Sequence, residues 1–195
     1  LSKEQFNSTI YTLALSFSIL VKIQVPGDKK KAGSFLEYLA ESLLSIVSGS
    51  SMSTSKYSRK IEGHEISINL DVWLRNKMKR IIAAPIKFST RERNTQIYFH
   101  HAMLTRCEQS NDLVPCTIPF ICNEYNAGRV SIPEQAFVSE TCIPGTWRSY
   151  QILFPLNGPV CYLDIPHGYT PTPDLCPEFI TWGDFFFDQL DHFLP

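Results

Sequence analysis

Apolar residues recur at helical spacing in two segments near the start of the chain. Residues 2–25 begin with Ser2, whose hydroxyl can accept a hydrogen bond from the free amides of a first helical turn. Residues 33–47 present a single apolar stripe. Both segments are predicted to be helices, and the serine-rich stretch 48–58 that follows is predicted to be a loop. The apolar positions behind the prediction are Phe6, Ile10, Leu13, Leu15, Phe17 and Leu20, then Phe35, Leu39, Leu43 and Ile46.

Two segments with the character of strands come next. Apolar and polar residues alternate over 66–73, and a short apolar run covers 81–88 after a basic link. Thr90 is then placed to cap a helix over 90–106. The combination of helices and strands predicts an α/β (α+β) fold with a central mixed sheet flanked by helices.

The second half of the chain continues this mixture of elements. Two apolar runs are separated by an Asn-Gly pair, which is a hairpin signal. An earlier run is interrupted by two prolines, which favours an edge or irregular strand. The predicted elements are an irregular strand at 114–123, a short helix at 133–139, hairpin strands at 150–156 and 159–165, and a terminal helix opening at 181–184.

The length of 195 residues and mass of 22.3 kDa fit a single domain over 1–195, alone or as part of a longer chain. No apolar run reaches about 18 residues without polar interruption, so no membrane span is expected. Residues 12–25 come nearest, and serine, lysine and glutamine side chains interrupt them. A core helix is the preferred interpretation of that segment.

Charge is distributed unevenly along the chain despite a net charge of −1. Residues 75–93 hold one acid, Glu92, whereas the part from Ser149 onward has acids but neither lysine nor arginine. A local basic cluster suits a nucleic-acid groove, and a solvated charged face is the alternative. The basic residues of the window are Arg75, Lys77, Lys79, Arg80, Lys87, Arg91 and Arg93.

The six cysteines do not occur in closely spaced pairs, which disfavours a structural zinc site. Several lie in apolar surroundings, as buried free thiols do. We therefore expect a reduced, cytoplasmic protein. An even number of cysteines also permits a disulfide-stabilised extracellular interaction domain, and a count of free thiols in denaturant separates the two.

Asp71 lies in the first predicted strand and Lys87 near the end of the second. Hydrolysis of a phosphodiester is commonly assisted by a metal ion and by a cation close to the attacking water. An aspartate and a lysine on neighbouring strands can supply the metal ligand and that cation. The alternative is that both are charges at the edge of a half-buried sheet.

The segment from Lys87 to Gln96 reads KFSTRERNTQ. It resembles the K-x-x-x-R-(D/E)-R-x-x-Q segment of type II restriction endonucleases of the PD-(D/E)XK superfamily, in particular the branch that reads CC/GG-containing sites. The upstream segment GSFLEYLAESLL is similar to the first core helix of that fold. The resemblance covers about residues 33–106 and implies a restriction-endonuclease-like core.

The resemblance also implies roles for individual residues. Asp71 would bind Mg²⁺, Lys87 would position or polarise the attacking water, and Glu37 would be a further catalytic and metal-binding carboxylate. DNA would be read at the start of the helix, because arginine can bond guanine and glutamate can accept from cytosine. The DNA-reading residues would be Arg91, Glu92 and Arg93.

Two positions depart from the family pattern. Pro85 stands two residues before the lysine, where the usual pattern has an acid. In the CC/GG-reading branch that acid comes from further along the next helix, where this chain has His100 and His101. Mg²⁺ prefers oxygen ligands, so the acid set is incomplete. Both histidines are interpreted as packing or backbone-bonding residues, with metal binding as the alternative.

These observations favour a Mg²⁺-dependent, site-specific endonuclease that hydrolyses duplex DNA as a type II restriction enzyme. A palindromic site is most simply cut by two related active sites, so a homodimer is expected. The expected location is the cytoplasm of a bacterium or archaeon, without membrane association. A DNA-binding protein on the same fold that has lost catalysis is the first alternative, and the extracellular interaction domain is the second.

Overall fold

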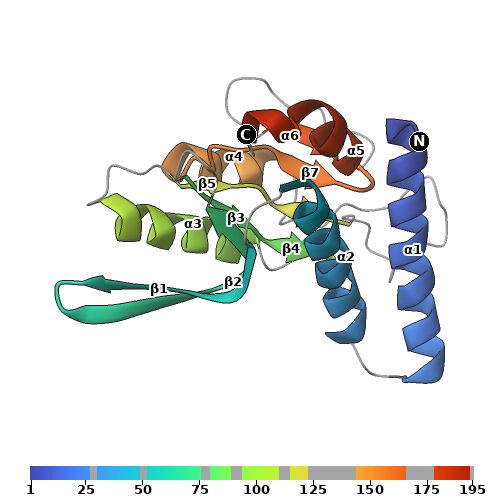
Figure 1. Cartoon of the computed structure of the whole chain (residues 1–195), viewed down its shortest axis with the longest axis horizontal. Coiled ribbons are helices and arrows are strands. Elements are labelled where there is room, and N and C mark those ends of the chain that lie inside the picture. The colour runs from blue at the N-terminus through green and yellow to red at the C-terminus, as the bar shows by residue number, and fades with distance from the viewer. Residues whose placement is uncertain are drawn as a thin grey trace.

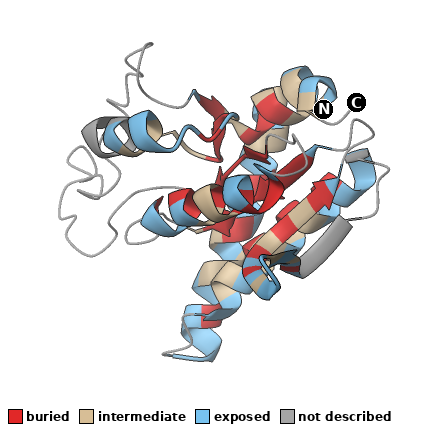
Figure 2. Ribbon diagram, turned by 90° about the vertical axis from the view of Figure 1, so that its left-hand side faces the viewer, coloured by how far each residue is buried: buried red, intermediate tan, exposed pale blue. Residues whose placement is uncertain are grey.

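The computed structural model describes residues 1–26, 30–48, 52–75, 80–88, 94–109, 115–122, 144–165 and 178–193. A mixed sheet lies between helices on both of its faces (Figure 1). Buried residues gather where the helices meet the strands, and exposed residues cover the outer faces of the helices (Figure 2). The predicted α/β (α+β) class, with a mixed central sheet and flanking helices, is confirmed.

The sheet combines antiparallel and parallel strands. Its first part has the order β1-β2-β3-β5, in which β1, β2 and β3 are antiparallel and β5 is parallel to β3. Its second part has the order β4-β6-β7-β8 and is parallel throughout. The strands are β1 Met52–Ile61, β2 His64–Arg75, β3 Ile81–Ala84, β4 Ile86–Lys87, β5 Cys116–Thr117, β6 Phe120–Ile121, β7 Val160–Tyr162 and β8 Phe179–Thr181.

Backbone hydrogen bonds connect the first part of the sheet to the second part. The Ile118 amide donates to the Ala83 carbonyl at 2.9 Å, and the Phe120 amide donates to the Pro85 carbonyl at 2.8 Å. The predicted strand over 81–88 is therefore present, but it is divided into β3 and β4 at Pro85, which has no amide hydrogen to donate. This interruption lies directly before the strand that holds Lys87.

The N-terminal and C-terminal helices cover one face of the sheet. Helix α1 (Lys3–Gln24) and helix α2 (Lys30–Ser48) pack there with the short segments α5 (Trp182–Asp184), η4 (Phe185–Gln189) and α6 (Leu190–Phe193). Their apolar side chains form the largest core cluster together with the sheet residues Val72, Leu74, Ile82, Ala84, Ile86, Phe120 and Ile180. Both N-terminal helices agree with the prediction from their apolar spacing.

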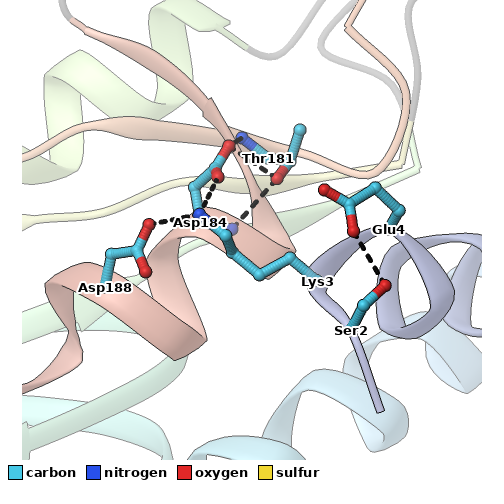
Figure 3. Close-up of polar contacts among 6 residues, drawn as sticks. All are labelled: Ser2, Lys3, Glu4, Thr181, Asp184 and Asp188. Atoms are coloured by element: carbon cyan, nitrogen blue, oxygen red, sulfur yellow. Dashed lines mark hydrogen bonds and ion pairs between the residues drawn. The ribbon is translucent and has the colours of Figure 1, made fainter.

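Polar contacts join the two ends of the chain (Figure 3). Ser2 caps α1 in a capping box with Gln5. The Lys3 ammonium lies 3.2 Å from Asp184 and also pairs with Asp188. Asp184 in turn completes a capping box with Thr181, whose hydroxyl accepts from the Asp184 amide at 3.0 Å. The terminal helix predicted to open at 181–184 is thereby confirmed and tied to α1.

The opposite face carries helix α3 (Asn94–Glu108) and helix α4 (Pro144–Leu153). Two smaller apolar clusters lie beneath them. One surrounds Tyr98 and Tyr162, and the other joins Leu104 and Cys107 to the β1–β2 hairpin. Tyr98 stacks on Tyr150 with a centroid distance of 5.1 Å, which packs α4 onto α3.

Two predictions from the sequence are wrong. Residues 52–61 belong to strand β1 and not to a loop, because pairing with β2 stabilises a serine-rich segment of low apolar content. Residues 150–153 belong to helix α4, so no hairpin forms around Asn157-Gly158. Asn157 does adopt a positive φ of 60°, but this turn leads from a helix into the parallel strand β7. The predicted helix at 133–139 lies outside the described residues.

Helix α1 is long and apolar enough to cross a membrane by length and composition alone, a test that the core helix of a soluble protein also passes. Here it packs through Ile10 and Ala14 against the main core, and Phe17 stacks on Phe35 of α2 at 4.1 Å. Ile19 and Ile23 on its outer face are exposed. The absence of a membrane segment stays a prediction.

Four of the six cysteines, Cys107, Cys116, Cys122 and Cys161, are buried free thiols. Burial raises the pKa of Cys116 to about 12, so this thiol is inert at neutral pH. Cys142 and Cys176 lie outside the described residues. The described cysteines thus agree with the prediction of buried free thiols and give no support to a disulfide framework.

Candidate active site

Strand β2 carries a bulge at Asp71. Ser55 pairs with Leu70 and the next residue of β1, Thr54, pairs with Val72, so Asp71 has no partner on β1. A bulge of this kind bends a strand and redirects a side chain, and such bulges are common beside active sites. The candidate metal ligand therefore lies at the one register shift between these two strands.

The extra residue also exchanges the two faces of β2. Ile68 and Leu70, before the bulge, pack with Leu104 of helix α3. Val72 and Leu74, after the bulge, pack in the cluster of α1 and α2 on the other face. A strand with an unbroken alternation would keep all four residues on one face. The bulge thus lets a single strand contribute to both cores while Asp71 lies at the crossing point.

Lys87 and Asp71 form a direct ion pair across neighbouring strands. The Lys87 ammonium donates to Asp71 Oδ2, and the Ile86 amide donates to the same oxygen at 2.8 Å. The Lys87 side chain is 8% exposed and that of Asp71 is 22% exposed, so solvent screens the pair only partly. The structure therefore brings together the aspartate and lysine that the sequence singled out.

Pro85 has a structural role at this site. Its carbonyl accepts the Phe120 amide, and it separates β3 from β4 just before the lysine. It offers no carboxylate, as the sequence indicated.

Glu37 lies on helix α2 and is half-buried. Its neighbours Leu36 and Ala40 pack in the same cluster as Ile86, so this helix lies against the strand that holds Lys87. Among the residues that the structure describes, no three histidine, cysteine or acidic side chains converge into a group able to hold a metal ion. Glu37 and Asp71 therefore do not form a complete ligand set with a third such residue of the described ranges.

The two adjacent histidines of α3 have different surroundings. His101 is buried, its Nδ1 lies 2.9 Å from the Thr117 hydroxyl, and it also bonds the Pro155 carbonyl. Burial lowers the pKa of His101 to about 4. His100 is half-buried, and its pKa is lowered by burial and by the positive charge of Lys87, while Asp71 opposes that shift. The packing role is thus correct for His101, whereas His100 lies within electrostatic reach of the Asp71–Lys87 pair.

The predicted DNA-reading residues Arg91, Glu92 and Arg93 lie outside the described residues. The described part of α3 begins directly after them, at Asn94, which is buried. Their role stays a prediction.

A second polar centre, which no sequence motif indicates, lies at the other end of α3. Glu108 is fully buried and accepts hydrogen bonds from the Tyr57 hydroxyl and the Arg59 guanidinium, with Arg59 Nε at 3.0 Å. These residues are about 50 positions apart, so no local motif reveals them. The network fixes the hairpin to the end of α3. Beside it lies an open cavity of about 570 Å³ lined by Ile61, Glu62, His64, Ile66, Ala102, Met103, Arg106 and Cys107.

One oxygen of the Asp71 carboxylate accepts no hydrogen bond from the described residues. Mg²⁺ is commonly held by one or two carboxylates and keeps several waters. Within the described ranges, both hydrogen bonds to the Asp71 carboxylate end on Oδ2. Oδ1 can therefore serve as a metal ligand without breaking either bond.

Comparison with known proteins agrees with this architecture at the level of the fold. No family model and no curated protein matches the sequence. A solved structure, the type IIP restriction endonuclease Kpn2I, superposes with a TM-score of 0.71 at 21% sequence identity. The match covers 96% of this chain and 63% of that chain, so this chain spans less than two thirds of the endonuclease. This chain therefore has the fold of a restriction endonuclease.

Proposed function

We propose that this protein is a metal-dependent endonuclease that hydrolyses phosphodiester bonds of duplex DNA, as type II restriction enzymes do. The observation that carries the proposal is the ion pair of Asp71 and Lys87 at a strand bulge, in a chain with a restriction-endonuclease fold. Both charges are largely buried, which carries a desolvation penalty, and a functional role would explain why this penalty is accepted.

Each residue has a chemical role in this proposal. Asp71 would hold Mg²⁺, with Glu37 as a further carboxylate from α2, and Lys87 would orient and polarise the attacking water. The ion, when bound, neutralises charge on the phosphate and lowers the pKa of water. The hydrogen bond to Asp71 Oδ2 supports this role, because it limits the positions of the Lys87 ammonium.

Recognition and assembly are part of the same proposal. Arg91, Glu92 and Arg93 would contact G·C pairs in the major groove, where bidentate arginine contacts distinguish guanine. A homodimer would present two active sites to a palindromic sequence, and the natural setting would be the cytoplasm of a bacterium or archaeon.

The test is cleavage of mixed plasmid DNA with Mg²⁺ and, separately, with EDTA. Discrete fragments that require the metal and disappear in Asp71→Ala and Lys87→Ala support the nuclease. Asp191→Ala and Lys22→Ala serve as matched controls, because both side chains are exposed and lie on other elements. Cleavage that persists in Asp71→Ala would exclude the proposed site.

A second candidate is a DNA-binding protein of the same fold without catalysis. Pro85 and the lack of a three-residue metal group among the described residues favour it. Tight DNA binding without cleavage, lost in Arg91→Ala, would support this candidate over the nuclease.

A further inference from the structure

The hairpin of β1 and β2 has two faces of different character. One face packs beneath helix α3 through Tyr57, Ile68 and Leu70. Because neighbouring residues of a strand point to opposite faces, the residues between these point away from α3. Their side chains are polar and exposed, and they form a surface that we call the open hairpin face: Lys56, Ser58 and Lys60 on β1, and Glu65, Ser67 and Asn69 on β2.

The bulge at Asp71 marks the border of the open hairpin face. Beyond the bulge, Val72 and Leu74 occupy the same side of the sheet, where α1 and α2 cover them. Before the bulge, the hairpin extends away from these two helices (Figure 1). One side of β2 is thus divided into an apolar half beneath helices and a polar half open to solvent, and the candidate active site lies where the two halves meet.

The open hairpin face offers cations and hydrogen-bond donors. Lys56 lies opposite Asn69 in the strand register, and neither it nor Lys60 forms an ion pair with the described residues. Glu65, the acid of this face, lies toward the hairpin tip, so the part next to Asp71 carries positive charge. Lysine, serine and asparagine side chains are typical contacts of the phosphates and sugars of DNA.

We infer that the open hairpin face binds the phosphate backbone of duplex DNA beside the phosphate that Asp71 serves. The inference rests on the proposed function, because it names a further surface for the same substrate. At about 3.3 Å per residue, the face extends about 13 Å from Asn69 to Glu65. That length corresponds to about four base pairs at 3.4 Å each. The face would therefore hold flanking DNA through its charge, without reading its sequence.

The test measures binding of the full chain to a fluorescein-labelled DNA duplex of mixed sequence. Fluorescence anisotropy in EDTA, over a series of NaCl concentrations, gives the affinity and its salt dependence without cleavage. Each phosphate contact contributes about 0.9 to the slope of log affinity against log salt. Lys56→Ala should therefore lower the slope by about 0.9 and weaken binding about eightfold at 0.1 M salt. Lys22→Ala, an exposed lysine on the outer face of α1, is the matched control and should change neither value.

Further variants separate charge from packing. Lys56→Arg keeps the charge and should keep the wild-type slope, whereas the double variant Lys56→Ala with Lys60→Ala should lower the slope by about 1.8. Glu65→Gln removes a negative charge from the face and should strengthen binding by at least about twofold. If Lys56→Ala fails to fold, Lys56→Gln removes the charge while retaining most of the side-chain length, and it must lower the slope by the same amount.

The outcomes separate the inference from the proposed function. A double variant with the wild-type slope overturns the inference, while cleavage by the wild-type protein with Mg²⁺ would still support the nuclease. A lowered slope in a protein that never cleaves DNA supports the hairpin surface and removes the catalytic proposal. An equal loss in Lys22→Ala would show that total charge, and not this face, determines binding, and would also overturn the inference. A duplex that stays unbound at low salt overturns both.

Discussion

Two carboxylates lie at opposite ends of the layer formed by β2 and α3, and the chain treats them differently. Glu108 is fully buried, and both of its oxygens accept hydrogen bonds from Tyr57 or Arg59. Asp71 is 22% exposed, lies at a bulge, and receives both of its described bonds on one oxygen. A carboxylate whose two oxygens both accept hydrogen bonds contributes to structure, whereas an oxygen without a described hydrogen bond can bind a ligand.

The free-energy cost of burying a carboxylate supports the same distinction between Glu108 and Asp71. Burying a charged group is favourable only when its partners satisfy it, and Glu108 meets this condition with three donors. The Asp71 carboxylate is less buried than that of Glu108, and its described donors are the Lys87 ammonium and one backbone amide. We therefore expect that Glu108 contributes mainly to stability and that Asp71 contributes mainly to activity.

The largest expected effect follows from Asp71→Asn. The amide oxygen can still accept from the Ile86 backbone, so folding should be retained, but the charge that attracts a cation is lost. Cleavage should fall by at least about 10³-fold, or about 4 kcal/mol of transition-state stabilisation. Single-turnover cleavage of plasmid DNA measures the loss. Glu108→Gln is the matched control, and an equal loss there would erase the proposed difference between the two carboxylates.

Glu108→Ala should give the largest change in stability. Removal of the carboxylate leaves Tyr57 and Arg59 without their acceptor, at a cost of about 3–4 kcal/mol in the free energy of unfolding. The value lies at the lower end for buried pairs, because the Arg59 side chain is 37% exposed. Urea denaturation followed by circular dichroism measures it.

Glu65→Ala, an exposed acid on the same hairpin, is the control and should change stability by less than about 0.5 kcal/mol. Equal effects of the two substitutions would mean that the buried network adds nothing.

The sequence predicted the two members of the Asp71–Lys87 pair but not the strand bulge that brings them together. Asp71 and Lys87 could be identified because strand periodicity and local spacing placed an acid and a lysine on successive strands. The bulge depends on the register between β1 and β2, whereas the serine-rich composition of residues 48–58 predicts a loop in place of most of β1. Pairing between strands is a non-local property, so a serine-rich strand does not reveal itself by composition.

The Glu108 network could not be predicted for a related reason. Glu108 ends an amphipathic helix, where a charged residue is usually solvated, and its partners come from the hairpin. The sequence also left open which of His100 and His101 faces the sheet. Adjacent residues of a helix diverge by about 100°, so a small rotation of the helix decides the orientation of each. The helix–strand alternation, by contrast, was sufficient for the fold class.

His101 provides a pH-dependent test of the region between the two carboxylates. Burial lowers the pKa of His101 in the folded state to about 4, below the ordinary histidine value of 6.5, so the unfolded chain binds the proton more readily. Its stabilisation is present above pH 6.5 and is lost as pH falls toward 4. Between pH 7 and pH 4.5 the loss should be about 2–3 kcal/mol. Urea titrations at several pH values measure it.

His101→Gln should flatten that part of the pH profile, whereas replacement of the exposed His64 by Gln should leave it unchanged. A wild-type profile that is level between pH 7 and pH 4.5 would show that His101 protonates without cost.

The smallest effect is expected at Asp184, which separates the contribution of hydrogen bonds to a carboxylate from the contribution of its burial. Asp184 is bonded by Thr181 and Lys3 much as Glu108 is by its own partners, but its side chain is 40% exposed.

Burial alone would raise the pKa of Asp184, but the hydrogen bonds from Thr181 and the ion pair with Lys3 lower it overall. The stabilisation by Asp184 is therefore present above pH 3.8, the ordinary pKa of aspartate, and is lost as pH falls below it. Thr181→Ala should cost only about 1 kcal/mol, as expected for a helix cap. Thermal denaturation at pH 7 measures this cost, and a loss as large as that of Glu108→Ala would show that the number of bonds, and not burial, determines what a carboxylate contributes.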